Sequence, residues 1–400
     1  MVLDVASIRG QYASLGGGWT YLNAHDCPQV PERVAAAIAR SVRLAPCMAD
    51  VESPSGLHSR PRAAGRLEGG SLIDAARVAV ADLCGATADR VVLGPSLPAL
   101  YQTLIRSMRP LLRHNSSMVL SRLDAPELNH VLRGAPARIT WAQPDLGTGQ
   151  LPASQYGELV DGSTRLVALS AAQGRIGTVA PVAEIIEQTR ARSRAWVLVD
   201  ASAYAAYRPL DVDDWDADIV AVDLAALGGP QVAALVFRDT YMYKRIDPGL
   251  ESPVAPSLAG GAPAVVDHLA AMVEGSGTRR TRLVHSMGQL QTHLQGLFDD
   301  LVDLLESRYT VHILGVSGEA GDGGFGNRIP RLSFGVRGVP AVTVHQRLLD
   351  NGLVTSMLPA DPVFTEMGVD EVGGAVTVSL SPFTTRHDIE QLARVVASLA

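Results

Sequence analysis

The sequence predicts an α/β fold with a mainly parallel sheet, followed by a smaller α+β part. Between residues 91 and 237, short apolar segments alternate with helical segments, as in parallel sheets that helices cover on both faces. After Pro263 the pattern changes to a long helical region and then to strands and helices in mixed order. These two observations divide the chain into a large and a small part.

The strands of the large part are predicted at short apolar segments bounded by turn residues. The last of them follows its predecessor too closely for a helical crossover, which allows it to be antiparallel. The segments are 91–93, 118–120, 166–169, 196–199, 219–222 and 233–237.

The helices of the large part have recognisable starts. Pro31 is tolerated in a first helical turn and marks one start. Ser71 is the expected cap of a second helix that runs to Leu83, and residues 182–192 form a third. Residues 46–70 are rich in Gly, Pro, Ser and Arg and are expected to form a loop.

The C-terminal part begins with a helical region over 264–307 that is interrupted near Gly275. The glycine-rich segment 318–327 lacks the phosphate-binding pattern, so a mobile surface loop is expected there. The remaining predictions are strands at 311–314, 332–336 and 376–380 and helices at 340–351 and 386–400.

Composition limits the classes of function. Hydrophobic residues make up 47% of the 400 residues and charged residues 19%, enough for a large core. The net charge of −7 argues against a broad nucleic-acid surface. No apolar run of membrane-spanning length and no secretory signal are visible, so a cytoplasmic protein without a membrane role is expected. Cys27, Cys47 and Cys84 lack the spacing of a disulfide framework or a metal site, and no metal is expected.

Lysine is nearly absent from the chain. Lys244 is the single lysine among the 34 basic residues, and the rest are arginines. A GC-rich genome produces such a bias without functional meaning. The bias still constrains chemistry, because any mechanism that needs a lysine amine has one candidate.

Several short motifs occur in the order typical of one family. The chain resembles the class-V aminotransferase superfamily, which contains the cysteine desulfurases, over roughly residues 15–400. The motifs are Tyr21-Leu22-Asn23-Ala24, Val91-Val92-Leu93-Gly94-Pro95-Ser96, Gly177-Thr178-Val179-Ala180-Pro181-Val182, Val197-Leu198-Val199-Asp200, Pro209-Leu210-Asp211-Val212, Trp215-Asp216-Ala217-Asp218-Ile219, Gly228-Gly229-Pro230 and Gly373-Gly374-Ala375-Val376.

The resemblance implies the fold of fold-type-I pyridoxal-phosphate (PLP) enzymes. In that fold a large domain carries a seven-stranded, mostly parallel sheet, and a small domain forms from the C-terminal segment with help from the N-terminus. It also implies a homodimer with the cofactor near the interface. The expected divisions are an N-terminal arm over 1–30 that joins the small domain, a large domain over 31–263, and a connecting helix with the small domain over 264–400.

The resemblance also assigns the cofactor contacts. Asp200 stands at the position of the aspartate that keeps the pyridine nitrogen protonated. Anchoring on Gly229-Pro230 puts Ala226 at the Schiff-base lysine and Ala225 at the adjacent histidine. An alanine methyl supplies neither a nucleophile nor a base. For Lys244, a solvated surface position is favoured over a relocated Schiff base.

The remaining family contacts are replaced as well. Residues that would stack on the ring, bind its hydroxyl or phosphate, or bind the substrate carboxylate align with Ala125, Leu128, Pro98, Gly174, Ala203 and Thr377. Ser96 is able to bind an anion, although local capping is the commoner role. Because native interiors tolerate few large voids, Tyr101, Tyr204, Tyr207 or a different ligand is expected to fill the remnant pocket.

Three functions follow as hypotheses. The leading one is a catalytically degenerate PLP-fold protein without a cofactor that binds a partner protein or a small ligand. Desulfuration by the family mechanism is contradicted, because the chain has no cysteine after Cys84. The second is an aminotransferase or lyase that uses PLP noncovalently or through Lys244. The third is unrelated chemistry in the old pocket, with candidates Asp124, Glu127, His130, Arg175 and Asp223.

Two further clusters are interpreted as structural. His25 lies beside Asp26 and Cys27, but neighbours in sequence rarely face each other productively. The run Arg279-Arg280-Thr281-Arg282 is expected to be a solvated helix face. Arg175 is the most interesting of the pocket candidates, since it could bind an anion, although a surface arginine is the commoner case.

Overall fold

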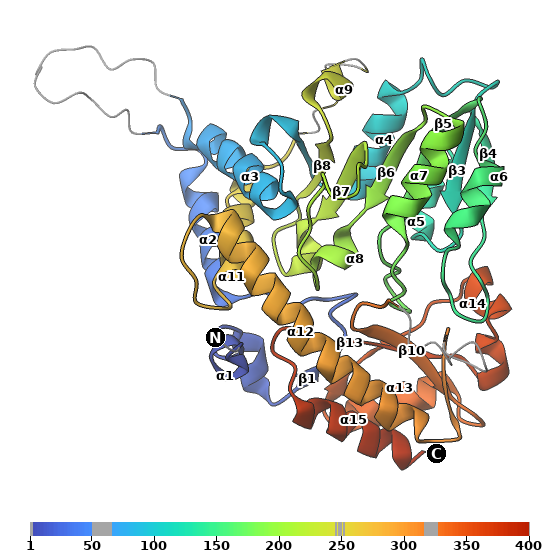
Figure 1. Cartoon of the computed structure of the whole chain (residues 1–400). Coiled ribbons are helices and arrows are strands. Elements are labelled where there is room, and N and C mark those ends of the chain that lie inside the picture. Colours follow the sequence, from blue (N-terminus) through green and yellow to red (C-terminus); the bar gives the residue numbers. More distant parts are fainter. Residues whose placement is uncertain are drawn as a thin grey trace, which may run out of the picture.

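The computed structural model describes residues 3–49, 66–244, 246, 250, 253–315 and 327–399. A large α/β domain lies beside a smaller domain built mainly from the C-terminal segment, and the helix α12, Arg279–Glu306, extends along both (Figure 1). Most of the expected glycine-rich loop at 318–327, and residues 50–65 of the loop expected at 46–70, fall outside the described residues.

A seven-stranded sheet forms the centre of the large domain, with the strand order β2-β8-β7-β6-β5-β3-β4. Only β8 runs opposite to the other six strands, as its short connection to β7 allowed. The predicted α/β fold with a mostly parallel sheet is therefore confirmed. The strands are β2 Val91–Gly94, β3 Ser117–Ser121, β4 Arg138–Ala142, β5 Thr164–Ser170, β6 Trp196–Asp200, β7 Ile219–Asp223 and β8 Ala233–Phe237.

Alternating side chains of these strands enter two cores, because consecutive residues of a strand point to opposite faces. Val197 and Val199 of β6 belong to the core on one face, and Leu198 belongs to the other. Helices α3 (Glu68–Cys84), α7 (Val182–Arg192), α11 (Gly261–Ala270) and α12 pack into the first core, and α4 (Leu97–Ser107) and α5 (Pro126–Leu132) into the second. This two-sided burial explains why the strands are apolar along their whole length.

The small domain contains a four-stranded antiparallel sheet with the order β12-β13-β10-β9. The N-terminal segment attaches to this domain: β1 pairs in parallel with β11, and Arg9 forms an ion pair with Asp388 at 3.2 Å. The elements are β1 Thr20–Tyr21, β9 Val311–Ile313, β10 Arg331–Val336, α13 Ala341–Asp350, β11 Leu353–Val354, β12 Ser356–Met357, α14 Pro362–Glu366, β13 Val376–Ser379 and α15 Arg386–Ala397.

Shorter elements connect these layers. The 3-10 helix η4 follows β7 directly and begins with the side chain of Asp223 as its cap. No helix in the described part of the chain is long and apolar enough to cross a membrane. The other helices are α1 Val5–Arg9, α2 Glu32–Leu44, α6 Tyr156–Leu159, α8 Ser202–Ala205, η4 Leu224–Leu227, α9 Thr240–Lys244 and α10 Pro256–Ala259.

Three local predictions were wrong or incomplete. Helix α3 begins at Glu68, one turn before the expected cap Ser71, which lies inside the helix. Strand β4 was not predicted, because its residues are only partly buried at the sheet edge. Arg279 and Arg280 are not a solvated face: they form ion pairs with Asp82 and Asp211 at 2.6 and 3.1 Å and so fix the start of α12.

Candidate functional site

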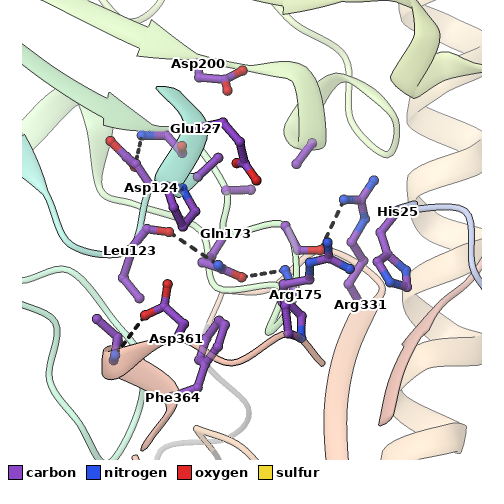
Figure 2. Close-up of a pocket in the computed structure, with 18 of the residues that line it drawn as sticks. His25, Leu123, Asp124, Glu127, Gln173, Arg175, Asp200, Arg331, Asp361 and Phe364 are labelled. Atoms are coloured by element: carbon purple, nitrogen blue, oxygen red, sulfur yellow. Dashed lines mark hydrogen bonds between the residues drawn. The ribbon is translucent and has the colours of Figure 1, made fainter. Parts of the chain in front are cut away.

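A pocket of about 450 Å³ lies where the carboxyl ends of β3, β5 and β6 face the small domain. This edge of an open α/β sheet is where ligands usually bind. The wall opposite the strands comes from the N-terminal segment, from Arg331 at the start of β10, and from the segment that leads into α14. Figure 2 shows residues from all of these segments pointing into one space.

Most of the residues predicted for the remnant pocket line this space. They are Ala125, Gly174, Arg175, Asp200, Ala203 and Ala226. Three predicted residues are not part of the lining. Ser96 caps α4 through the backbone N–H of Ala99, Thr377 is buried with its hydroxyl 2.8 Å from that of Ser333, and Ala225 lies within η4.

Of the polar residues proposed for unrelated chemistry in the pocket, some line it and others do not. Asp124, Glu127 and Arg175 line the pocket, whereas His130 is exposed on α5. Asp223 does not line the pocket, because its carboxylate accepts the backbone N–H of Ala225 at 2.9 Å and caps η4.

One wall of the pocket is acidic. The Asp124 carboxylate accepts the backbone N–H of Ser170 at 2.8 Å, and the Asp200 carboxylate accepts that of Ser202 at 2.9 Å. Burial, assisted by the nearby negative charge of Asp200, raises the pKa of Asp124 to about 7. Burial also raises the pKa of Asp200. A carboxyl group with a pKa near neutrality can give or take a proton at physiological pH.

The opposite wall is basic. It brings together His25, Arg175 and Arg331, which stand far apart in the sequence (Figure 2). Asp26 forms an ion pair with Arg175 at 2.7 Å and lies 3.4 Å from His25 Nε2. The imidazole of His25 is 1% exposed, and its Nδ1 lies 2.8 Å from the hydroxyl of Ser379. Burial lowers the pKa of His25, so the ring is neutral at pH 7.

A tight turn brings Arg175 and Arg331 together. The side-chain oxygen of Gln173 accepts the backbone N–H groups of Arg175 and Ile176, which fixes the turn after β5. Gly177 has φ of 78° and lies so close to the backbone of Arg331 that a Cβ would collide with its carbonyl oxygen. Only glycine combines this conformation with such a close approach.

The predicted tyrosines do not fill the pocket. Tyr101 lies on α4 and is buried in the core on that face of the sheet, and Tyr204 packs edge-on against Trp215 with the ring centroids 5.1 Å apart. Tyr207 lines a smaller adjoining cavity of about 40 Å³, which shares Ala226 and Arg331 with the main pocket. The space beside the small residues therefore remains open.

Sequence reasoning missed part of the site. His25 was interpreted as a structural residue of the arm, but the arm carries it into the pocket wall, while Cys27 is exposed and is not part of the lining. Arg122, Gln173, Arg331 and Asp361 were not singled out. Within the sequence, Arg331 is one of many arginines, and its one signal was its place at the start of a strand whose other residues are uncharged.

Lys244, the single lysine, is far from the pocket along the sheet. Ala233 at the start of β8 pairs with Asp223 at the pocket end of β7, and Phe237 at the end of β8 pairs with Ile219. Helix α9, which ends at Lys244, follows β8 at the edge where the parallel strands begin (Figure 1). The pocket lies at the other edge.

Comparison with known sequences places the chain among relatives. Residues 58–248 match the family described as aminotransferase class-V. The uncharacterized protein MT3887 of Mycobacterium tuberculosis is 36% identical over 417 residues, and the match covers 100% of both chains. The cysteine desulfurase-like protein ustD of Aspergillus flavus is 24% identical over 243 residues, with 58% of this chain and 53% of that protein covered.

Solved structures show the same fold. The cysteine desulfurase CsdA of Escherichia coli superimposes with a TM-score of 0.76 at 18% identity, covering 100% of this chain and 98% of that one. The apo cysteine desulfurase of Thermococcus onnurineus gives a TM-score of 0.79 at 16% identity, with 98% and 97% covered. With the full-length mycobacterial relative and the family match, these results identify the chain as a member of the aminotransferase class-V family with the fold of the cysteine desulfurases.

Proposed function

We propose that this protein is a catalytically degenerate member of its family, which holds no PLP as an internal aldimine and instead binds a small ligand in the pocket. The single observation that carries the proposal is where the chain places Ala226 and Lys244. Ala226 occupies the pocket wall, and the only lysine of the chain follows a strand that leads away from it.

The residues of the pocket do not fit covalently held PLP. That cofactor contributes an aldehyde which a lysine amine captures, a phosphate that needs several hydrogen-bond donors, and a ring that an aspartate keeps protonated. Asp200 lies in the lining and meets the last requirement. Ser96, the candidate phosphate ligand, is a helix cap outside the lining, and no described lining residue is a lysine.

Noncovalent PLP is the second candidate function, and the position of Asp200 favours it. The carboxylate lies at the end of β6, in the pocket, where it could meet a pyridine nitrogen. Burial raises the pKa of Asp200, which disfavours the ionised carboxylate that a pyridinium needs and so weakens this case. We therefore rank the degenerate protein first.

The decisive experiment is a titration of the purified protein with PLP, followed by absorbance, with borohydride reduction and peptide mass spectrometry. The degenerate protein gives no saturable aldimine band and no specific adduct. A saturable band with a reduced adduct at Lys244 would overturn the proposal. Saturable binding without an adduct would support noncovalent PLP.

A homodimer in the cytoplasm, which the family resemblance implies, also remains a proposal. Exposed apolar side chains on and beside α2 and α3 support it, since such patches often mark contacts between proteins. They are Val42, Met48, Leu67 and Val78. Sedimentation velocity at several concentrations tests it, and a constant monomer mass would contradict it. A protein partner in place of a second copy would leave the protein monomeric on its own.

A further inference from the structure

One guanidinium in the pocket has no counter-ion. Arg331 is 4% exposed, and no carboxylate of the described residues lies within ion-pair distance of it. Its Nε donates to the Tyr207 hydroxyl at 3.1 Å, and its Nη1 donates to the Gly174 carbonyl at 3.3 Å. Both acceptors are neutral, so they orient the guanidinium without compensating its charge.

A second buried arginine shows what a purely structural guanidinium looks like in this protein. Arg328 is also 4% exposed, and it donates to the carbonyl oxygens of Ile176, Thr148 and Gly315. These three hydrogen bonds engage both of its terminal nitrogens, and it is not part of the pocket lining. Arg331 makes fewer hydrogen bonds and lines the cavity.

The groups around Arg331 leave one positive charge without a partner. Arg175 is balanced by Asp26, whose carboxylate is ionised because its contacts with His25, Ser356 and Arg175 keep its pKa far below the usual range despite its burial. His25 is neutral. Across the pocket, burial favours the protonated forms of Asp124 and Asp200, and neither lies within ion-pair distance of Arg331.

We propose that the corner formed by His25, Asp26, Arg175 and Arg331 binds the carboxylate of a small organic molecule. This inference rests on the proposed function, because it requires a pocket free of covalent cofactor. A carboxylate carries the single negative charge that balances the corner, and its two oxygens match the planar fork of a guanidinium. A phosphate dianion would leave one negative charge buried without a partner, which is costly.

The body of the ligand would lie between the two walls. Ala125, Ala203 and Ala226 leave room beside the strands, and Phe364 offers an apolar face from the small domain. The site therefore takes a carboxylate on an apolar or weakly polar body.

The test uses benzoate, with benzamide as its neutral isostere and inorganic phosphate as the dianion, in isothermal titration of the protein freed of PLP. We expect benzoate to bind at least about tenfold more tightly than benzamide, because a carboxylate that pairs with a buried, uncompensated guanidinium gains at least that much affinity. Benzoate should also bind more tightly than phosphate. Equal affinities for benzoate and benzamide would overturn the proposal.

Two variants locate the carboxylate. Arg331→Gln should weaken benzoate binding by about tenfold or more and leave benzamide unchanged, whereas Arg386→Gln, a control on exposed α15, should change neither. Loss of benzoate binding in both variants, or in neither, would overturn the assignment.

If Arg331→Gln fails to fold, Asp26→Asn provides a second test of the carboxylate site. Removing the Asp26 charge releases Arg175, so benzoate should bind at least about threefold more tightly and phosphate should gain more than benzoate does. No gain for either anion would overturn the proposal. A PLP adduct at Lys244 would contradict the proposed function but not the carboxylate site, because the benzoate titration measures binding to that site directly.

Discussion

The guanidinium of Arg122 holds the carboxylate of Glu366 through two hydrogen bonds, at 2.7 and 3.0 Å. Arg122 directly follows β3 of the large domain, and Glu366 ends α14 of the small domain. Phe364 of the same helix lines the pocket, as does Arg122 itself. This ion pair therefore joins the two domains at the wall of the candidate site.

Glu366→Gln should loosen the segment that carries Phe364 without unfolding the protein. The pair is solvent-exposed, and exposed ion pairs contribute little to global stability, so we expect no measurable change in Tm. Hydrogen exchange of the amides in 359–367 should become faster, because this contact across the domain boundary is lost. Glu390→Gln on α15 is the control. Unchanged exchange in 359–367 would show that the pair does not restrain α14.

Ala226→Lys should restore an amine to the pocket wall. Because Ala226 lines the cavity that also contains Asp200, a lysine there should capture PLP and give a reduced adduct at position 226. The absorbance titration and peptide mapping described above measure this. Ala225→Lys, one position away and outside the lining, is the matched control. An adduct in the control but not in Ala226→Lys would show that the alignment of the Schiff-base position is shifted.

The fold could be predicted from the sequence because its strands are buried on both faces. Segments such as 196–199 are apolar throughout, as strands of a doubly covered sheet are, and turn residues bound them. Strand β4 escaped prediction because its residues lie at the sheet edge, where burial is partial and the pattern is weak. The cap at Ser71 was wrong because the helix gains a further turn from residues before it, including the buried Gly69.

The site was less predictable than the fold. Ala226 and Asp200 could be placed because strand ends and glycine motifs anchor them. His25 and Arg331 reach the pocket through long-range packing of the N-terminal segment and of β10, which no local pattern records. Thr377 lies on a strand, as expected, but its hydroxyl is hydrogen-bonded to that of Ser333 and its side chain does not line the cavity.

Asp124 should make stability depend on pH. Its pKa in the folded protein is about 7, against an ordinary value of 3.8, so the folded state holds the proton more tightly. The resulting stability is fully present below pH 3.8 and is lost as the pH rises through 7. Between pH 5 and pH 8 the wild type should lose about 2 kcal/mol more than Asp124→Asn does. Urea unfolding of both proteins at the two pH values measures this difference.

Asp145→Asn is the control for that measurement. The backbone N–H of Thr148 lowers the pKa of Asp145, so this group titrates below the pH window and its contribution should be the same at pH 5 and pH 8. Equal pH dependence in the wild type and Asp124→Asn would show that Asp124 is ionised throughout, and that the acidic wall carries a full charge at pH 5.

His268 should make stability depend on pH in the direction opposite to Asp124. Its Nε2 lies 2.9 Å from the hydroxyl of Tyr12, so it ties the N-terminal segment to α11. Burial lowers the pKa of His268 from 6.5 to about 4, so its stabilising contribution is present above pH 6.5 and is lost as the pH falls toward 4. Between pH 7 and pH 5 the wild type should lose about 2 kcal/mol more than His268→Gln. His387→Gln, a control at an exposed position on α15, should lose as much stability between pH 7 and pH 5 as the wild type does. If His268→Gln also loses as much as the wild type, another group causes the acid sensitivity.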